Sequence, residues 1–221
     1  MQRELRQTAD GSHTLALPGT DITYHSHHGA IAESRHVFIE AGLAPVLSNI
    51  TNNPVHVFEM GLGTGLNALL TLLTARKEQR KIYYTAFELF PLTEEEAASI
   101  NYGQLLDAEA ELKALHNAAW ETAVTIDPFF TIQKQQQSLL DTQYSNGFHC
   151  IYFDAFAPGH QPELWTRAVF EKLFGMMEAG GILVTYCSKT EVRRAMTTAG
   201  FSVEKIPGPR GKREMVRAKK D

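Results

Sequence analysis

A glycine-rich segment contains the residue types that point most directly to chemistry in this sequence of 221 residues. Gly61, Gly63 and Gly65 follow the apolar run 55–58 and precede a helix-like stretch that begins at Leu66. Glycine permits positive φ angles and lets a ligand approach the backbone closely. The first turn of a helix also offers N–H groups without intrahelical partners, and these groups bind anionic or polar ligands. The order strand, turn and helix therefore predicts a nucleotide-binding site, with an ordinary glycine turn as the alternative.

The spacing of the glycines and a following acid narrow the choice of nucleotide. The segment 59–65 reads Glu-Met-Gly-Leu-Gly-Thr-Gly, whereas a dinucleotide pyrophosphate favours Gly-x-Gly-x-x-Gly. Glu88 ends the next predicted strand, 81–87, about 20 residues beyond the turn, where an acid binds a ribose. Its two carboxylate oxygens match the two ribose hydroxyls. This pattern is typical of S-adenosylmethionine (SAM) methyltransferases, so we expect SAM as the cofactor; the alternative for Glu88 is a solvated strand end.

A third acid follows another predicted strand, 148–154. Open α/β sheets bind ligands at the carboxyl ends of their central strands, which places Asp154 beside the sulfonium of the cofactor. The aromatic and proline residues that follow it, Phe156 and Pro158, are expected to shape a slot for a flat base. A helix cap or a loop salt bridge is the alternative role for Asp154.

The charge distribution is asymmetric. Between Lys189 and Asp221 there are ten basic and four acidic residues, which gives this segment +6 and leaves −10 on the rest of the chain. A basic end on an acidic body is what a surface facing nucleic acid looks like, although a solvated tail has the same composition. The candidates for phosphate contacts are Lys189, Arg193, Arg194, Lys212 and Arg213.

Composition favours a globular protein of one domain, or one domain with a small extension. Nothing resembles a signal peptide, and no apolar stretch approaches the ~18 residues that span a bilayer. Cys150 and Cys187 do not have metal-ligand spacing, and no metal site is expected. A reduced, cytoplasmic protein is the resulting expectation.

The order of elements predicts an α/β fold. A hairpin is expected within residues 12–27 and a helix over 29–41, ended by Gly42. Capping boxes at Thr93/Glu96 and Ser188/Glu191 predict two further helix starts. The remaining elements expected are strands near 129–133, 148–154 and 181–187, a helix opening at Pro162, and a closing strand over 213–218.

Several motifs together resemble one family. They are Glu59–Asn67, Phe153–Pro158 with Pro162–Thr166, Pro207–Met215 and the segment Gly29–Glu40. The sequence is similar over residues 20–218 to the methyltransferase module of the tRNA wobble-uridine modifying enzymes of the MnmC type, found alone as the MnmD type. The resemblance implies a Rossmann-like class I SAM-dependent methyltransferase fold. We then expect a mostly parallel seven-stranded sheet with helices on both faces. Residues 1–50 would form a small N-terminal hairpin and helix extension, and residues 51–221 the methyltransferase domain.

The resemblance also implies a reaction and a set of site residues. That family transfers a methyl group from SAM to the amine of 5-aminomethyl-(2-thio)uridine at the tRNA wobble position, giving 5-methylaminomethyl-(2-thio)uridine. The tRNA anticodon region would be the partner, and separate oxidase or aminomethyl-forming enzymes would act upstream. Asp154 would sit at the reacting amine, and the expected cofactor-binding residues are Glu59, Gly61, Gly63, Thr64, Gly65, Asn67, Glu88 and Asp154.

One segment departs from the family pattern. Family members often have Gly-Asp after the third strand, where the acid binds the adenine amine, whereas this chain reads Gln133-Lys134-Gln135-Gln136-Gln137. A glutamine carbonyl can accept the same hydrogen bond. The residues that contact adenine are left open.

The expected mechanism is direct attack by a neutral primary amine, in which the protein aligns the reacting groups and Asp154 orients the amine and accepts its proton. Amine methylation needs no thiolate, so Cys187 is interpreted as a small buried residue. His25, His27, His28 and His36 are interpreted as surface or substrate-rim residues.

Two other functions remain compatible with the sequence. One is a SAM-dependent enzyme that acts on a small amine, either an N-methyltransferase or an aminopropyl transferase. The other is a non-catalytic SAM-fold module that binds RNA or a partner. The basic end favours tRNA over a small polyamine, and the intact set of glycines with Glu88 and Asp154 favours catalysis.

Overall fold

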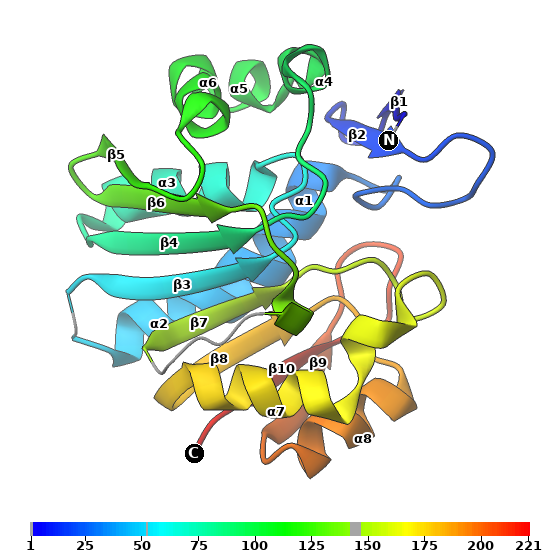
Figure 1. Cartoon of the computed structure of the whole chain (residues 1–221), viewed down its shortest axis with the longest axis vertical. Coiled ribbons are helices and arrows are strands. Elements are labelled where there is room, and N and C mark those ends of the chain that lie inside the picture. Colours follow the sequence, from blue (N-terminus) through cyan, green and yellow to red (C-terminus); the bar gives the residue numbers. More distant parts are fainter. Residues whose placement is uncertain (1, 52, 142–146) are drawn as a thin grey trace.

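The computed structural model describes residues 2–51, 53–141 and 147–221, and folds them around one eight-stranded sheet (Figure 1). The strand order is β5-β6-β4-β3-β7-β8-β10-β9. The strands are β3 (Val55–Met60), β4 (Ile82–Phe87), β5 (Ala123–Asp127), β6 (Phe130–Gln135), β7 (Phe148–Phe153), β8 (Met177–Thr185), β9 (Ser202–Pro207) and β10 (Glu214–Lys219). The pairs from β6 to β8 are parallel, and β5, β10 and β9 join by antiparallel pairing.

The prediction of a mostly parallel sheet is confirmed, but the sheet has one strand more than expected. Neither β9 nor β5 was given a range from the sequence, and β5, which precedes β6, pairs with it as an antiparallel edge. Its residues are exposed or only partly buried, so its apolar pattern is weak. A strand that packs little against the core leaves little trace in the sequence.

Helices cover both faces of the sheet (Figure 1). A helical run from α1 (Ala30–Ser34) through the π-helix η1 (Arg35–Leu43) to α2 (Ala44–Asn49) lies on one face with α3 (Leu66–Glu78). The other face carries the 3-10 helix η3 (Pro162–Trp165), α7 (Arg167–Met176) and α8 (Thr190–Thr198). The remaining helices are α4 (Glu94–Ser99), α5 (Tyr102–Leu105), α6 (Glu109–Asn117) and the 3-10 helix η2 (Leu139–Asp141). None of the helices that the structure describes is long and apolar enough to cross a membrane.

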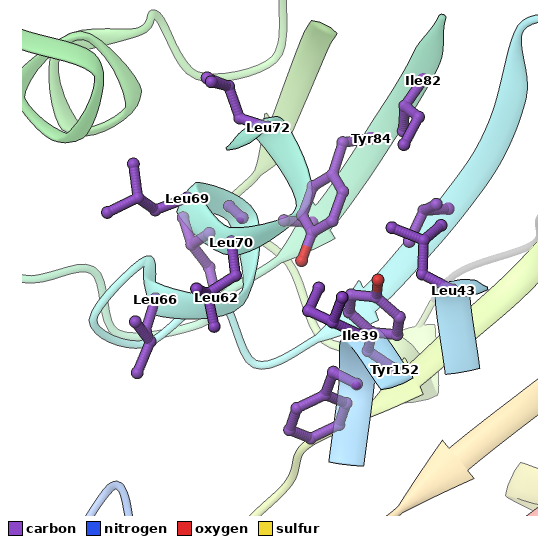
Figure 2. Packing of buried hydrophobic residues seen from close by; sticks show 14 of the residues in the cluster. Ile39, Leu43, Leu62, Leu66, Leu69, Leu70, Leu72, Ile82, Tyr84 and Tyr152 are labelled. Atoms are coloured by element: carbon purple, nitrogen blue, oxygen red, sulfur yellow. The ribbon is translucent and has the colours of Figure 1, made fainter. Parts of the chain in front are cut away.

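The alternation of side chains along the central strands creates two buried clusters. In β3, Val57 packs with the helices of the first face, whereas its neighbour Phe58 packs with those of the second. Such alternation follows from the two-residue period of a strand. Figure 2 shows part of the first cluster, which includes Ile39 from η1, Leu69 from α3 and Tyr84 of β4. Residues on both sides of position 50 belong to this cluster, so the division into an extension and a domain stays a prediction.

The first helical run corrects one expectation. A helix ending at Gly42 was predicted, but the helical run continues through Gly42 to Asn49. A Cβ atom at Gly42 would lie 2.7 Å from Cγ2 of Val184 in β8. Gly42 is therefore required for close contact between helix and sheet rather than for ending the helix.

Two local predictions at the N-terminal sides of helices have different outcomes. The hairpin expected within residues 12–27 is confirmed in part, because Ala16 bridges Thr23 antiparallel and the backbone N–H groups of Leu17 and Tyr24 donate to the carbonyl oxygens of Ile22 and Leu15. The longer pairing, of β1 (Glu4–Gln7) with β2 (His13–Ala16), was not predicted. The Ser188 capping box does not form, because α8 begins at Thr190 without a side-chain cap. A serine caps a helix only where its own backbone occupies the N-cap position, and in α8 that position belongs to Lys189.

The other expected elements are confirmed. The Thr93 capping box starts α4, with both of its reciprocal hydrogen bonds present. Strands β6, β7, β8 and β10 lie where strands were expected. The helix expected at Pro162 begins as η3 and continues after Thr166, whose side chain caps α7.

We predict that Gly42→Ala destabilises the fold. The added methyl group must displace Val184, and overpacking of this kind costs about 1–3 kcal/mol, more than the helix propensity gained, about 1 kcal/mol. The matched control is Gly175→Ala in α7, where nothing lies within 4 Å of the added Cβ. Chemical denaturation should show a lower free energy of unfolding for Gly42→Ala and an unchanged or higher one for Gly175→Ala. Equal stabilisation by both would contradict this account of Gly42.

Candidate active site

A cavity of about 490 Å³ lies at the carboxyl ends of β3, β4, β7 and β8. Its walls also include residues 21–27 of the segment between β2 and α1, here called the N-terminal arm. The chain order reverses between β3 and β7, which makes this the topological switch point of the sheet. Open α/β sheets bind ligands at such a point.

The glycine turn after β3 forms the floor of the cavity. The φ angles of Gly61, Gly63 and Gly65 are 89°, 50° and 75°, values that favour glycine. A Cβ atom at Gly61 would lie 3.1 Å from the carbonyl oxygen of Asp154, and one at Gly63 would lie 3.1 Å from Cδ1 of Tyr24. The glycines therefore bring the turn close to both neighbouring segments of the cavity wall.

Glu88 follows β4 and lines the cavity. One carboxylate oxygen, Oε2, accepts a hydrogen bond from the backbone N–H of Gly63 at 3.0 Å, and Oε1 accepts from that of Phe90 at 2.8 Å. These bonds hold the side chain against the glycine turn. Each carboxylate oxygen has a second lone pair, so both can still accept from a ligand.

Asp154 follows β7 and is joined to a second carboxylate through one amide. The Asn67 side chain donates from Nδ2 to Oδ2 of Asp154 at 2.9 Å and to Oε1 of Glu59 at 2.8 Å. Glu59 is fully buried beneath the turn and does not line the cavity. Its carboxyl group is therefore connected to the cavity wall through Asn67.

The surroundings of Asp154 raise its pKa above that of a carboxyl group exposed to water. Burial raises the pKa of Asp154 to about 7, and the nearby Glu33 carboxylate adds to the increase. The hydrogen bond from Asn67 and the charge of Lys212 act in the opposite direction. A carboxyl group with a pKa near neutrality can both accept and release a proton at physiological pH.

Glu33 and Lys212 form an ion pair in the cavity wall that sequence reasoning missed. Nζ of Lys212 lies 2.7 Å from Oε1 of Glu33 and 4.1 Å from the ring centroid of Tyr186. The hydroxyl group of Tyr186 donates to the carbonyl oxygen of Ala155 at 2.8 Å. Lys212 was expected on an outward basic rim, but its side chain lines the cavity. The family-like segments 29–40 and 207–215 contained both residues, but nothing in either segment indicated the pairing.

The N-terminal arm is held over the cavity by Tyr24 and Arg3. Arg3 donates to the Tyr24 hydroxyl group at 2.7 Å and pairs with Glu96 at 2.7 Å. The Tyr24 ring meets the Phe156 ring edge-on, with 5.2 Å between centroids. The prediction that Phe156 shapes an aromatic wall agrees with its place in the cavity lining, and Tyr24 is a second aromatic member that was not predicted.

His25 of the arm was interpreted as a surface or substrate-rim residue, and the structure favours the second alternative. The residue is buried and lines the cavity, and its Nε2 lies 2.8 Å from Oγ1 of Thr64 in the glycine turn. Burial lowers the pKa of His25 to about 4, so the ring is neutral. This contact ties the arm to the turn. His27 is exposed, as expected.

The structure brings most of the predicted site residues together and leaves others apart. Gly61, Gly63, Thr64, Asn67, Glu88, Asp154 and Phe156 line the cavity, whereas Gly65 and Pro158 do not. Lys189, Arg193, Arg194 and Arg213 also lie outside the cavity lining. Lys189 precedes α8, Arg193 and Arg194 belong to it, and Arg213 precedes β10.

Residues 133–137 do not line the cavity either. Oε1 of Gln133 accepts from the Tyr83 hydroxyl group at 2.8 Å, so this glutamine pairs with β4. The residues that meet an adenine ring stay open.

The cysteines are buried, in agreement with the structural interpretation. Burial raises the pKa of the Cys187 thiol and that of the Cys150 thiol above their usual range, which keeps both protonated. In the described part of the chain, His, Cys, Asp and Glu side chains form no group of three that could hold a metal ion.

Comparison with known proteins places this site in a family. Residues 95–221, more than half of the chain, match the family model described as S-adenosyl-L-methionine-dependent methyltransferase. The chain is 30% identical over 218 residues to the tRNA 5-methylaminomethyl-2-thiouridine biosynthesis bifunctional protein MnmC of Cupriavidus metallidurans. That alignment covers 91% of this chain and 32% of the relative, so the chain spans about a third of that protein's length.

Two solved structures share the fold. MNMC2 from Aquifex aeolicus superposes with a TM-score of 0.82 at 22% identity, covering 100% of this chain and 70% of the other. Spermidine synthase from Thermotoga maritima gives a TM-score of 0.60 at 14% identity, covering 98% of this chain and 67% of the other. The Rossmann-like fold predicted from the sequence is confirmed by these similarities.

Proposed function

The chain belongs to the family of S-adenosyl-L-methionine-dependent methyltransferases, and we propose that it methylates the amine of 5-aminomethyl-(2-thio)uridine at the wobble position of tRNA. The observation that carries the proposal is the position of Asp154. This carboxylate lies on the cavity wall, close to the glycine turn on one side and to Phe156 on the other. A group that can take a proton from an amine is thereby placed where a nucleotide cofactor and a flat base would meet.

The cavity fits SAM, which supplies an electrophilic methyl group on a positively charged sulfur. Glu88 would hold the ribose hydroxyls, and the backbone at Gly61 and Gly63 leaves room for close approach of the cofactor. The carboxylate of Asp154 suits a neighbouring sulfonium.

The acceptor side of the cavity suits an amine attached to a flat ring. Phe156, Tyr24 and Tyr186 supply aromatic surfaces, and aromatic rings stack on unpaired bases of RNA. Asp154 would orient the amine and accept its proton, so no covalent enzyme intermediate is needed. Positioning of the amine is the larger contribution in this proposal, and proton transfer the smaller.

The tRNA substrate is supported by the relative from Cupriavidus metallidurans and by charge. Exposed arginines, including Arg194 and Arg213, lie in the same C-terminal part of the chain as Lys212 of the cavity wall. Phosphate contacts supply much of the affinity of proteins for nucleic acids. In this proposal the protein acts in the cytoplasm on the tRNA anticodon region, after separate enzymes have formed the aminomethyl group.

A second function is favoured by the charge of the cavity. Its lining includes the carboxyl groups of Asp21, Glu33, Glu88 and Asp154 against the ammonium group of Lys212, and an acidic cavity attracts a small polyamine. Transfer of a methyl or aminopropyl group to a small amine is therefore the alternative to test beside tRNA.

The first prediction from this site concerns the cofactor. Glu88→Gln should weaken SAM binding about ten- to a hundredfold, because a hydrogen bond to a charged group contributes about 1.5–3 kcal/mol. Isothermal titration calorimetry with SAM measures the effect, and Glu94→Gln at an exposed position of α4 is the matched control. Equal SAM affinity in the Glu88→Gln and control variants would rule out the proposed ribose contact.

The second prediction concerns the reaction. Transfer of labelled methyl from SAM to tRNA bearing 5-aminomethyl-2-thiouridine should fall about 10²-fold or more in Asp154→Ala, within the range known for positioning and acid–base groups. Asp154→Asn keeps the shape of the side chain and should retain partial activity. Because the reaction needs ionised Asp154 and a neutral amine, activity should rise with pH through about 7 and then level off.

The controls for this assay separate the candidate functions. Tritium counts in unmodified tRNA and in polyamines such as putrescine should stay at background. Equal labelling of modified and unmodified tRNA would contradict the substrate assignment, and labelling of putrescine alone would favour an N-methyltransferase that acts on a small amine. Full activity in Asp154→Ala would disprove the role of that residue.

The third prediction concerns the basic surface. The charge reversals Arg194→Glu and Arg213→Glu should weaken tRNA binding and leave SAM binding unchanged. Each lost phosphate contact should lower the log–log slope of affinity against salt by about 0.7–0.9. Fluorescence anisotropy with labelled tRNA measures this slope, and Arg167→Glu in α7, outside the basic segment, is the control. A tRNA affinity that does not depend on salt would mean that this surface is only solvated.

A further inference from the structure

We propose that the Glu33–Lys212 ion pair balances the charge around Asp154, so that Asp154 can take a proton from the bound amine while Lys212 disfavours the ammonium form of that amine. Both residues would act through Asp154 and the amine rather than on the transferred methyl group, so they are positioning residues. The inference rests on the proposed amine methylation, and it concerns the control of proton transfer at the same site.

The pair is held firmly by groups from three separate segments. Oε2 of Glu33, on α1, accepts from the backbone N–H of Ser26 in the N-terminal arm at 2.8 Å. Its other carboxylate oxygen, Oε1, lies 2.7 Å from Nζ of Lys212, which in turn lies over the Tyr186 ring. Glu33 is 8% exposed, and both partners line the cavity that contains Asp154. A long, flexible lysine side chain held on two sides is fixed in position, which a solvated surface pair would not require.

A carboxylate base and an amine substrate have opposing requirements in this cavity, and the ion pair reconciles them. A carboxylate beside an amine favours the ammonium form, which cannot attack a methyl group. The Lys212 ammonium in the same cavity opposes that effect, since a like charge disfavours protonation of the substrate amine. Glu33 holds the lysine in place, and its charge increases the affinity of Asp154 for the proton that the amine loses, whereas the charge of Lys212 decreases that affinity. The proton passes from the amine nitrogen to a carboxylate oxygen of Asp154, so atoms and charge balance without another reactant.

Other charged and titratable groups also surround Asp154, and they set the background for this effect. Glu59 lies beyond the shared amide of Asn67, and the neutral ring of His25 belongs to the arm. The titratable groups that line the cavity are Asp21, Tyr24, His25 and His27 (arm), Glu33 (α1), Glu88 (after β4), His160 (after β7), Tyr186 (after β8) and Lys212 (between β9 and β10), while Glu59 (β3) and Tyr84 (β4) are buried outside the lining. Lys212 is the lysine among these groups and no arginine accompanies it, so no other such side chain supplies a positive charge when Lys212 is substituted.

The test measures the titration of Asp154 itself, in the protein without SAM. Carbon-detected NMR of carboxyl-labelled protein follows the Asp154 side chain, assigned by its loss in Asp154→Asn. Glu33→Gln should move the Asp154 midpoint to lower pH, and Lys212→Met should move it to higher pH, each by about one unit or more, as expected for the loss of one charge from the same cavity. The double variant Glu33→Gln/Lys212→Met should return the midpoint toward that of the parent protein, and Lys212→Arg should keep it.

The matched control is Lys205→Met at the Lys205–Glu214 surface pair. That pair has a similar N–O distance, 2.8 Å, but lies outside the cavity, so its loss should leave the Asp154 midpoint unchanged. Unchanged midpoints in Glu33→Gln and Lys212→Met, or shifts of both in the same direction, would overturn the proposal. If Lys212→Met fails to fold because Glu33 is left unpaired, Glu33→Gln and the double variant still decide the question, because neither leaves that buried charge.

Activity measurements then distinguish this inference from the proposed function. The acidic limb of the pH profile for methyl transfer should move in the same directions as the NMR midpoints, while the Kd for SAM stays unchanged. Shifted midpoints without any methylation of modified tRNA would refute the proposed substrate and leave the charge coupling intact. Methylation of tRNA with unshifted pH limbs would refute the inference and leave the substrate assignment intact.

Discussion

The shared hydrogen bonding of Asn67 is the interaction on which the site depends. Its side-chain amide donates to Glu59 and to Asp154, two carboxyl groups that otherwise repel each other in a region of low polarity. Burial raises the pKa of Glu59 well above its usual range, and the same amide limits that increase. Because Asn67 belongs to the first turn of α3, the glycine turn before the helix and the strand end at Asp154 are fixed together.

The N-terminal arm completes what the strand ends begin. The glycine turn, Glu88 and Asp154 form an open edge of the sheet, as in any fold of this kind. Tyr24 and His25 close one side of it, and they are held by Arg3 and Thr64. The arm therefore forms part of the cavity wall, and the acceptor side of the site depends on it.

The sequence predicted the parts of the site that are local and missed those that are distant. Gly61, Glu88 and Asp154 each follow a strand, and strand ends of a parallel sheet meet at one edge, so periodicity and spacing were sufficient. The Glu33–Lys212 pair joins residues 179 positions apart, and Arg3 meets Glu96 across 93 positions. Such contacts depend on packing of the whole chain. Gly42 was misjudged for the same reason, since its role depends on Val184 in a distant strand.

The net charge of the C-terminal segment overestimates the positive charge that is available for binding a ligand. Its net +6 suggested a continuous basic rim, but several of its basic residues are already paired within the fold. Lys205 pairs with Glu214, and Arg217 and Lys219 with Glu204, while Lys212 pairs with Glu33 inside the cavity wall. The antiparallel pairing of β9 and β10 brings these opposite charges together, so much of the positive charge is paired across the two strands. The charge left for a polyanion then belongs to the exposed arginines around α8 and the β9–β10 turn, Arg194, Arg210 and Arg213. A polyanion bound there would lie beside the turn that carries Lys212, and the nucleotide it presents would meet the cavity from that side.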